Sequence, residues 1–331
     1  MTIFLNILFL IIGMVLLIKG ADFFVSGASA IAKRLKVPSL FVGLTIVAMG
    51  TSLPELSVSI TSAASNSIDM SVGNVVGSNL FNMFFVLGVV ALFSPIPMSK
   101  SSQKIDLPFL IAITGMLLLF GLDMALDGAP SNMLSRVESI LFLIILILYL
   151  TILILNAKKS RRKKIEAGEV LVEEETKKDL KIWQIILFIV GGLAAVVFGG
   201  ECVSTTAKFL ALEMGMSEAL VGLTIVAVGT SLPELVTSVV AARKHENDIA
   251  LGNVIGSNII NISLILGSVG VIAQAPISAV ILTDIAMLFV ATLLFSVLCV
   301  RKSDINKKEG ILFLALYIAY IAFAIIRNYC F

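Results

Sequence analysis

The chain has 331 residues, of which 58% are hydrophobic and 14% charged, and its mean hydropathy is +1.06. This balance is far from that of a soluble globular protein and is typical of a chain that crosses a membrane several times. The net charge is only +2, and no basic stripe is interleaved with aromatic residues, which excludes a nucleic-acid-binding protein.

Ten apolar segments follow one another along the chain, each with about the 17–25 residues that a helix needs to cross a bilayer. The first lacks a basic n-region and is too long for a signal peptide, so we expect it to be retained as a span. The first and sixth reach about 30 residues, or about 45 Å of helix, so both must tilt or wrap round a core. We therefore predict an all-α membrane protein with transmembrane helices at 3–32, 39–64, 71–93, 105–122, 135–156, 182–211, 219–241, 249–272, 277–300 and 310–327.

The positive charges alternate from one loop to the next. Loops that follow odd-numbered spans contain 20 of the 24 lysine and arginine residues, and the one long polar loop, 157–181, holds nine of them. Because positive loops stay in the cytoplasm, we predict that loop 157–181 is cytoplasmic and that both termini lie outside. The expected location is the cell membrane, plasma or inner, as a multi-pass protein in contact with lipid.

The second half of the sequence repeats the first with a shift of 179 residues. "VGLTIVAMGTSLPEL" at 42–56 falls on "VGLTIVAVGTSLPEL" at 221–235, and "GNVVGSNLFN" at 73–82 falls on "GNVIGSNIIN" at 252–261. Each half has five spans, an odd number, so the second copy enters the membrane from the opposite side. This predicts two inverted five-helix repeats, 1–156 and 182–331, joined by the linker 157–181, which is an architecture of transporters.

Each copy of GTSLPEL places a proline and a glutamate within an apolar helix. Pro54 removes a helical hydrogen bond, so we expect partly freed backbone carbonyls around Ala48 to Gly50. The spacing of Thr51, Ser52 and Glu55 predicts that one helical face offers hydroxyl and carboxylate oxygens. Thr230, Ser231 and Glu234 repeat this arrangement. A charged residue at mid-membrane depth marks a functional site, and an all-oxygen cage suits a hard cation such as Ca²⁺.

Amides recur on the neighbouring spans. Asn74, Ser78 and Asn82 form a polar stripe at i, i+4 and i+8, and Asn253, Ser257 and Asn261 repeat it. We interpret Asn74 and Asn253 as contacts between helices and the other four as candidate ligands. Gly73 and Gly77, like Gly252 and Gly256, have the GxxxG spacing that allows close helix approach.

On these two GTSLPEL blocks and two GSN blocks, the chain resembles prokaryotic-type members of the sodium/calcium exchanger family, within the cation/Ca²⁺ exchanger superfamily. The resemblance covers essentially the whole chain. It implies ten helices with two α-repeats, four core helices that hold the ions, and two long tilted helices that slide across them. It implies Glu55 and Glu234 as the main Ca²⁺ carboxylates, hydroxyls for Na⁺, backbone carbonyls at Ala48 and Ala227, and central amides. The candidate metal-binding residues are Glu55, Glu234, Thr51, Ser52, Thr230, Ser231, Ser78, Ser257, Asn82, Asn261, Ala48 and Ala227.

We therefore expect a secondary antiporter that exchanges Na⁺ for Ca²⁺ by alternating access, electrogenic and independent of K⁺, because Asn82 and Asn261 stand where some K⁺-dependent relatives have an aspartate. H⁺/Ca²⁺ exchange is the alternative, and a passive channel is a further one. An intramembrane hydrolase using Ser52 or Ser231 lacks a base, since the only histidine, His245, lies in a charged loop. We expect no enzyme activity and no cofactor, and the sequence indicates no protein partner. Asp22, close to Lys19, and its repeat equivalent Glu201 line the ion entrance or serve structure.

Overall fold

The structure, a computed structural model, describes residues 2–65, 68–126, 128, 131–166, 180–215, 227–302 and 304–330. Nearly all of this is helical, as predicted. Eight helices in the described part are long and apolar enough to cross a membrane, or nine if the bent pair over 39–64 forms one span. The tenth predicted helix, 219–241, is described only from Ala227, as α12 (Ala227–Gly229) and α13 (Leu232–Arg243). The count of ten thus stays a prediction.

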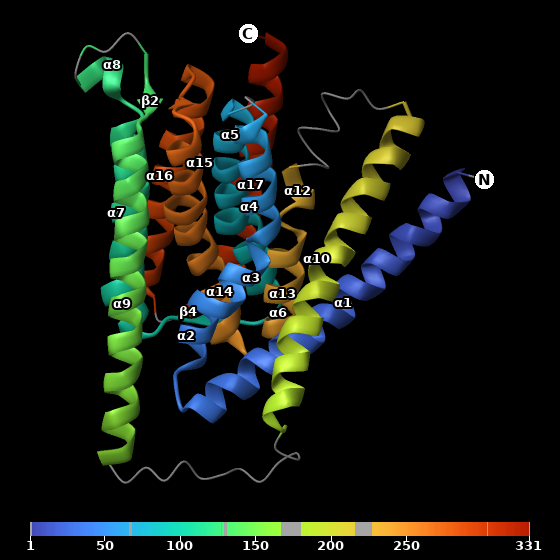
Figure 1. The fold of residues 1–331 in the computed structure, drawn as a ribbon, viewed down its shortest axis with the longest axis vertical. Coiled ribbons are helices and arrows are strands. Elements are labelled where there is room, and N and C mark those ends of the chain that lie inside the picture. The colour runs from blue at the N-terminus through green and yellow to red at the C-terminus, as the bar shows by residue number, and fades with distance from the viewer. Residues whose placement is uncertain are drawn as a thin grey trace.

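Two long helices, α1 (Thr2–Leu35) and α10 (Ile182–Glu213), lie side by side and run obliquely to the other helices (Figure 1). Glycines allow this contact. A Cβ added to Gly192 would lie 2.5 Å from the backbone nitrogen of Phe24, and one added to Gly199 would lie 2.6 Å from that of Leu17. The tilt agrees with the expectation from their length.

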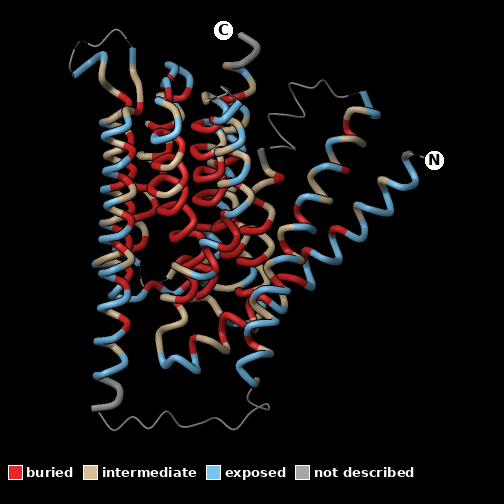
Figure 2. The backbone as a smooth tube through the Cα atoms, in the orientation of Figure 1, coloured by how far each residue is buried: buried red, intermediate tan, exposed pale blue. Residues whose placement is uncertain are grey.

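Two composite helices form the core. One consists of α5 (Ile68–Leu80), the π-helical segment η2 (Phe81–Val86) and α6 (Leu87–Phe93). The other consists of α14 (Asn247–Ile260), the π-helical segment η5 (Asn261–Leu266) and α15 (Gly267–Ile272). In the most apolar stretch of each, 78% of the residues are buried, compared with 17% in α1 and 22% in α10. The central helices are therefore enclosed by protein, and the tilted pair exposes apolar side chains to lipid (Figure 2).

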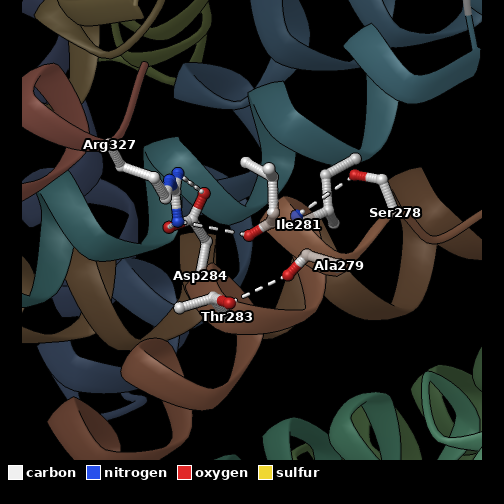
Figure 3. Close-up of polar contacts among 7 residues, drawn as sticks. Ser278, Ala279, Ile281, Thr283, Asp284 and Arg327 are labelled. Carbon is white, nitrogen blue, oxygen red and sulfur yellow. Dashed lines mark hydrogen bonds and ion pairs between the residues drawn. The ribbon is translucent and has the colours of Figure 1, made fainter. Parts of the chain in front are cut away.

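The remaining helices surround this core. They are η3 (Ser102–Asp106), α7 (Leu107–Phe120), the short α8 (Asp123–Leu126), α9 (Arg136–Glu166), α16 (Ala279–Arg301) and α17 (Lys307–Cys330). An ion pair joins the last two: Nη1 and Nη2 of Arg327 donate to the two carboxylate oxygens of Asp284, each at 2.9 Å (Figure 3). Ser278 caps the start of α16 by accepting the N–H of Ile281 (Figure 3).

Four two-residue strands link the two halves of the chain. β1 (Ile96–Pro97) pairs antiparallel with β4 (Asp304–Ile305), and β2 (Met133–Leu134) pairs antiparallel with β3 (Ala275–Pro276). In Figure 1, β2 and β4 lie at opposite ends of the helices. β1 and β3 are 179 residues apart, whereas β2 and β4 are 171 apart, so the repeat shift relates β1 to β3 but not β2 to β4.

Candidate functional site

Both GTSLPEL copies interrupt their helix at the serine. The first span divides into α2 (Ser39–Val42), η1 (Gly43–Val47), α3 (Ala48–Thr51) and α4 (Leu53–Ala64), with a bend of 45° before α4. Ser52 leaves the helical region with ψ 5°, and Ser231 does the same with ψ 6°. The proline that follows stands in the first turn of the new helix, where its missing N–H costs nothing. Each glutamate also lies in that first turn, where the positive end of the helix dipole stabilises a carboxylate.

The two copies exchange hydrogen bonds. Ser231 Oγ donates to Glu55 Oε1 at 3.0 Å, and Ser52 Oγ donates to Glu234 Oε1 at 3.2 Å. Ser52 and Glu55 of one copy are both buried, and each forms its hydrogen bond with the other copy. The serine of each copy instead serves the glutamate of the other, so the site exists only where the two halves meet.

Further hydroxyls and one carbonyl surround these bonds. Ser78 Oγ lies 3.0 Å from Ser231 Oγ, and Ser257 Oγ lies 3.5 Å from Glu234 Oε1. The carbonyl of Ala48 accepts the N–H of Ser52 at 3.1 Å, and the hydroxyl of Ser257 approaches it at 3.5 Å. The prediction of a freed carbonyl was therefore wrong at Ala48, which keeps its helical bond because the break falls four residues later. A carbonyl has two lone pairs, so this oxygen can still face a cation.

One oxygen of each glutamate has no hydrogen-bond donor. Glu55 and Glu234 are both 0% exposed, and their Oε2 atoms are unpartnered in the described part of the chain. Burying a carboxylate costs several kcal/mol of solvation free energy, and a nearby opposite charge can offset this cost. Two buried carboxylates without an ion-pair partner in the described residues are a candidate site for a cation.

The two outer amides connect helices, as interpreted from the sequence. Asn74 Nδ2 donates to Ser59 Oγ at 3.1 Å, and the equivalent Asn253 Nδ2 donates to Ser238 Oγ at 2.9 Å. Sequence reasoning did not name Ser59 or Ser238 for the site. The signal was present, since these two serines are also 179 residues apart.

The candidate ligands nearer the centre of the site differ in whether their polar atoms have hydrogen-bond partners. Asn82 is 0% exposed, and neither its Oδ1 nor its Nδ2 has a partner in the described part of the chain. Asn261 begins η5 and donates to Asn79 Oδ1 at 3.0 Å. Thr51 donates to Asn253 Oδ1 at 2.9 Å, whereas the Thr230 hydroxyl is unpartnered among the described residues. Asn82 lies in the π-helical segment η2 and Asn261 in the equivalent segment η5. π-Helical segments often occur at functional sites, but no sequence pattern predicted these two.

The GxxxG prediction is confirmed for the second copy. Cβ atoms added to Gly252 and Gly256 would lie 2.8 Å from Leu40 O and 2.6 Å from Ala48 Cβ, so α14 lies very close to the helix that enters the first motif. The repeat would place 219–227 against Gly73 and Gly77. Most of that segment is outside the described residues, and the side chain of Ala227 is too, so its predicted role is untested.

A cavity of about 600 Å³ lies beside the second motif, between α4 and α10. Its lining includes Pro54, Thr230 and the exposed Glu201. The repeat-equivalent Asp22 on α1 is paired instead: Lys244 Nζ lies 2.8 Å from its Oδ1. The partner of Asp22 is thus Lys244, in the turn after α13, and not the nearby Lys19. Of the two equivalent acids, one faces a cavity and the other ties a long helix to a turn.

The fold and the site define a multi-pass membrane protein with a buried, oxygen-lined centre between two copies of one motif. The family model described as "Sodium/calcium exchanger protein" matches residues 5–155 and 183–326. The chain belongs to the sodium/calcium exchanger family.

Relatives cover nearly its whole length. The chain is 38% identical to "Putative antiporter CaxA" of Alkalimonas amylolytica, over 95% of this chain and 96% of that protein. It is 33% identical to "Sodium/calcium exchanger MaX1" of Methanosarcina acetivorans, over 96% of this chain and 97% of that protein. A solved structure of the sodium-calcium exchanger NCX_Mj superposes with a TM-score of 0.83 at 32% identity, covering 97% of this chain and 99% of that one.

Proposed function

We propose that this protein is a secondary antiporter that exchanges Na⁺ for Ca²⁺ across the membrane by alternating access. The observation that carries the proposal is the reciprocal pair of serine–glutamate bonds, together with the second oxygen of each buried glutamate, which has no donor among the described residues. Two carboxylates match the charge of one Ca²⁺, and their surroundings supply the further oxygens that this ion needs for six to eight ligands. Family membership and the likeness to NCX_Mj support the same reading.

Within this proposal the side chains have separate tasks. Glu55 and Glu234 neutralise the dication, and neutral oxygens suit the smaller charge of Na⁺. The proposed neutral ligands are the hydroxyls of Thr51, Ser52, Ser78, Thr230, Ser231 and Ser257, the amides of Asn82 and Asn261, and the carbonyls of Ala48 and Ala227.

The proposed architecture is two inverted five-helix repeats, 1–156 and 182–331, with the cytoplasmic linker 157–181 and both termini outside the plasma or inner membrane. The family model matches the chain in two segments that correspond to these halves. The serine–glutamate bonds are also equivalent under the 179-residue shift, which relates strands β1 and β3 as well. These observations support a pseudo-two-fold axis between the halves.

Exchange of H⁺ for Ca²⁺ is the second candidate. It is favoured by the absence of a third carboxylate at Asn82 and Asn261, so that the two glutamates alone could trade two protons for one Ca²⁺. Both candidates use the same buried carboxylates, so the structure of the site fits either coupling ion.

Transport into proteoliposomes separates the candidates. Purified protein is reconstituted with internal Ca²⁺ indicator, and Na⁺, K⁺ and pH gradients are imposed one at a time. We expect Ca²⁺ uptake against its own gradient only when Na⁺ is loaded inside. Uptake driven by a pH gradient without Na⁺ would establish the proton-coupled alternative, and flux that never runs against the Ca²⁺ gradient would indicate a channel.

A further inference from the structure

An amide network connects the two GSN blocks beside the proposed cation site. Asn79 Nδ2 donates to the backbone carbonyl of Asn258 at 3.2 Å, and Asn261 Nδ2 donates to Asn79 Oδ1 at 3.0 Å. All three side chains are buried, with at most 1% exposure. The network therefore runs from an acceptor in one helix, through Asn79 in the other, and back to Asn261.

The backbone carbonyl fixes the orientation of both amides. It can only accept, so Asn79 must present its nitrogen to Asn258 and its oxygen to Asn261. Asn261 must in turn present its nitrogen to Asn79. Its Oδ1 is consequently directed away from the network, and that oxygen is buried and unpartnered among the described residues.

Orientation decides whether Asn261 can bind a cation. An amide oxygen is a ligand for Na⁺ or Ca²⁺, whereas an amide NH₂ carries partial positive charge and repels both. Asn261 begins η5, which packs against α4, the helix that carries Glu55. The equivalent Asn82 has no such restraint, since both of its polar atoms are unpartnered in the described part of the chain.

The other repeat does not copy the network. The equivalent of Asn79 is Asn258, and its Nδ2 donates to Val254 O at 3.0 Å, within its own helix. It therefore does not hold Asn82 as Asn79 holds Asn261. The two central amides differ in freedom although their sequence contexts match.

From this asymmetry we infer that Asn79 is a positioning residue, which holds the Asn261 amide with its oxygen available to a transported cation. This inference rests on the proposed function, because it requires a cation at the site. In this proposal Asn79 contacts no ion itself and acts only through Asn261.

A double-mutant cycle tests the inference on the full-length protein in detergent. The readout is thermal stabilisation by CaCl₂ or NaCl, with choline chloride as the ionic-strength control, which gives an apparent Kd for each cation. We expect Asn79→Ala to weaken the apparent affinity about three- to tenfold, since a net hydrogen bond is lost. In an Asn261→Ala background the same change should have no further effect, because there is no amide left to orient.

Asn258→Ala is the matched control. It removes the equivalent side chain but keeps the backbone carbonyl, so Asn79→Ala should retain its full effect in that background. If Asn79→Ala fails to fold, Asn79→Leu removes the same polar atoms at similar volume and enters the same cycle.

An equal loss with and without Asn261, or an unchanged apparent Kd in a folded Asn79 variant, would overturn the inference. A parent protein that no cation stabilises would also overturn it. The proposed function fails separately, if the parent binds cations but moves no Ca²⁺ in the proteoliposome assay.

Discussion

The chemistry of the site rests on two carboxylates that the protein does not neutralise by itself. Glu55 and Glu234 each accept from one serine of the other repeat, and no lysine or arginine forms an ion pair with either in the described part of the chain. A serine hydroxyl donates a hydrogen bond but carries no charge that would neutralise a carboxylate. The proposed cation would supply the missing positive charge.

Removing either charge should therefore stop transport. We expect Glu55→Gln and Glu234→Gln each to lower Ca²⁺ uptake about 100-fold or more, because loss of one partner from a buried charge pair costs about 3–5 kcal/mol. Uptake into proteoliposomes measures this, with insertion checked by size-exclusion chromatography. Glu213→Gln, at the exposed end of α10, is the control and should transport normally. Normal uptake by a folded Glu55 or Glu234 variant would remove that residue from the site.

A second pair of charges has a structural task. Asp284 and Arg327 join α16 to α17 with two hydrogen bonds, and their side chains are only 16–17% exposed (Figure 3). We expect Asp284→Asn to destabilise the protein by about 2–3 kcal/mol, because it leaves the Arg327 guanidinium without its counter-charge in a partly buried place. The melting temperature in detergent should fall by several degrees. Asp284→Leu combined with Arg327→Leu should melt higher than Asp284→Asn, and the reverse order would contradict this explanation.

At the scale of elements, the contact between α1 and α10 depends on glycines that bring backbone against backbone. The Gly192 Cα faces the backbone of α1, whereas its neighbour Gly191 faces open space: an added Cβ there meets only Leu187 Cδ1, at 3.9 Å. Of these two neighbouring glycines on α10, Gly192 thus has no space for a larger side chain, whereas Gly191 has.

Gly192→Ala should force the two helices apart. The new Cβ would lie 2.5 Å from the backbone nitrogen of Phe24, and a backbone atom can move away only if its helix moves with it. We expect a loss of about 1–3 kcal/mol of stability and slower Ca²⁺ uptake. Gly191→Ala should be neutral or slightly stabilising, since alanine favours helix over glycine by about 1 kcal/mol. Thermal melts of the two variants measure the difference, and equal melting temperatures would show that the contact is not tight in solution.

Some structural elements could be predicted from the sequence and others could not, for physical reasons. The break before α4 was predictable because Pro54 lacks an N–H, a property of the residue itself. The π-helical segments at Asn82 and Asn261 were not, since their hydrogen bonding depends on packing between helices. The bonding of Ser52 and Ser231 to the glutamate of the other copy was also missed. The spacing of residues within one copy does not tell which side chain of the other copy each will contact. The two-residue strands carry too few residues for any pattern.

At the scale of the whole molecule, the loop charges predict how the chain is oriented in the membrane. Most of helix α9 lies between Ser131, which precedes the helix, and Ser160, which stands near its C-terminal end. We expect a cysteine at Ser131 to react with an impermeant maleimide from outside and one at Ser160 only from the cytoplasm, with the three native cysteines replaced. A cysteine at Lys33 should behave like the one at Ser160. Labelling of Ser131 and Ser160 from the same side would overturn the proposed inverted repeat.

The net charge that crosses the membrane in one exchange cycle is a property of the whole molecule. The proposed cage has two formal negatives, Glu55 and Glu234, while Asn82 and Asn261 add none. One Ca²⁺ would balance this cage, and the proposed hydroxyl ligands would serve additional Na⁺. The resemblance to the family implies three Na⁺, so one net charge would cross the membrane in each cycle.

Exchange should then respond to voltage. One charge couples to the membrane potential at about 2.3 kcal/mol per 100 mV, so an inside-negative potential should speed Na⁺ entry and Ca²⁺ exit. Proteoliposomes clamped with valinomycin and K⁺, at varied Na⁺, measure this, and an ionophore-free K⁺ gradient tests K⁺ dependence separately. Asn261→Asp adds a third negative and should alter the Na⁺ dependence or admit K⁺. Ca²⁺ flux that is indifferent to voltage would sink the electrogenic cycle, because a balanced exchange of two Na⁺ or two H⁺ for one Ca²⁺ moves no net charge.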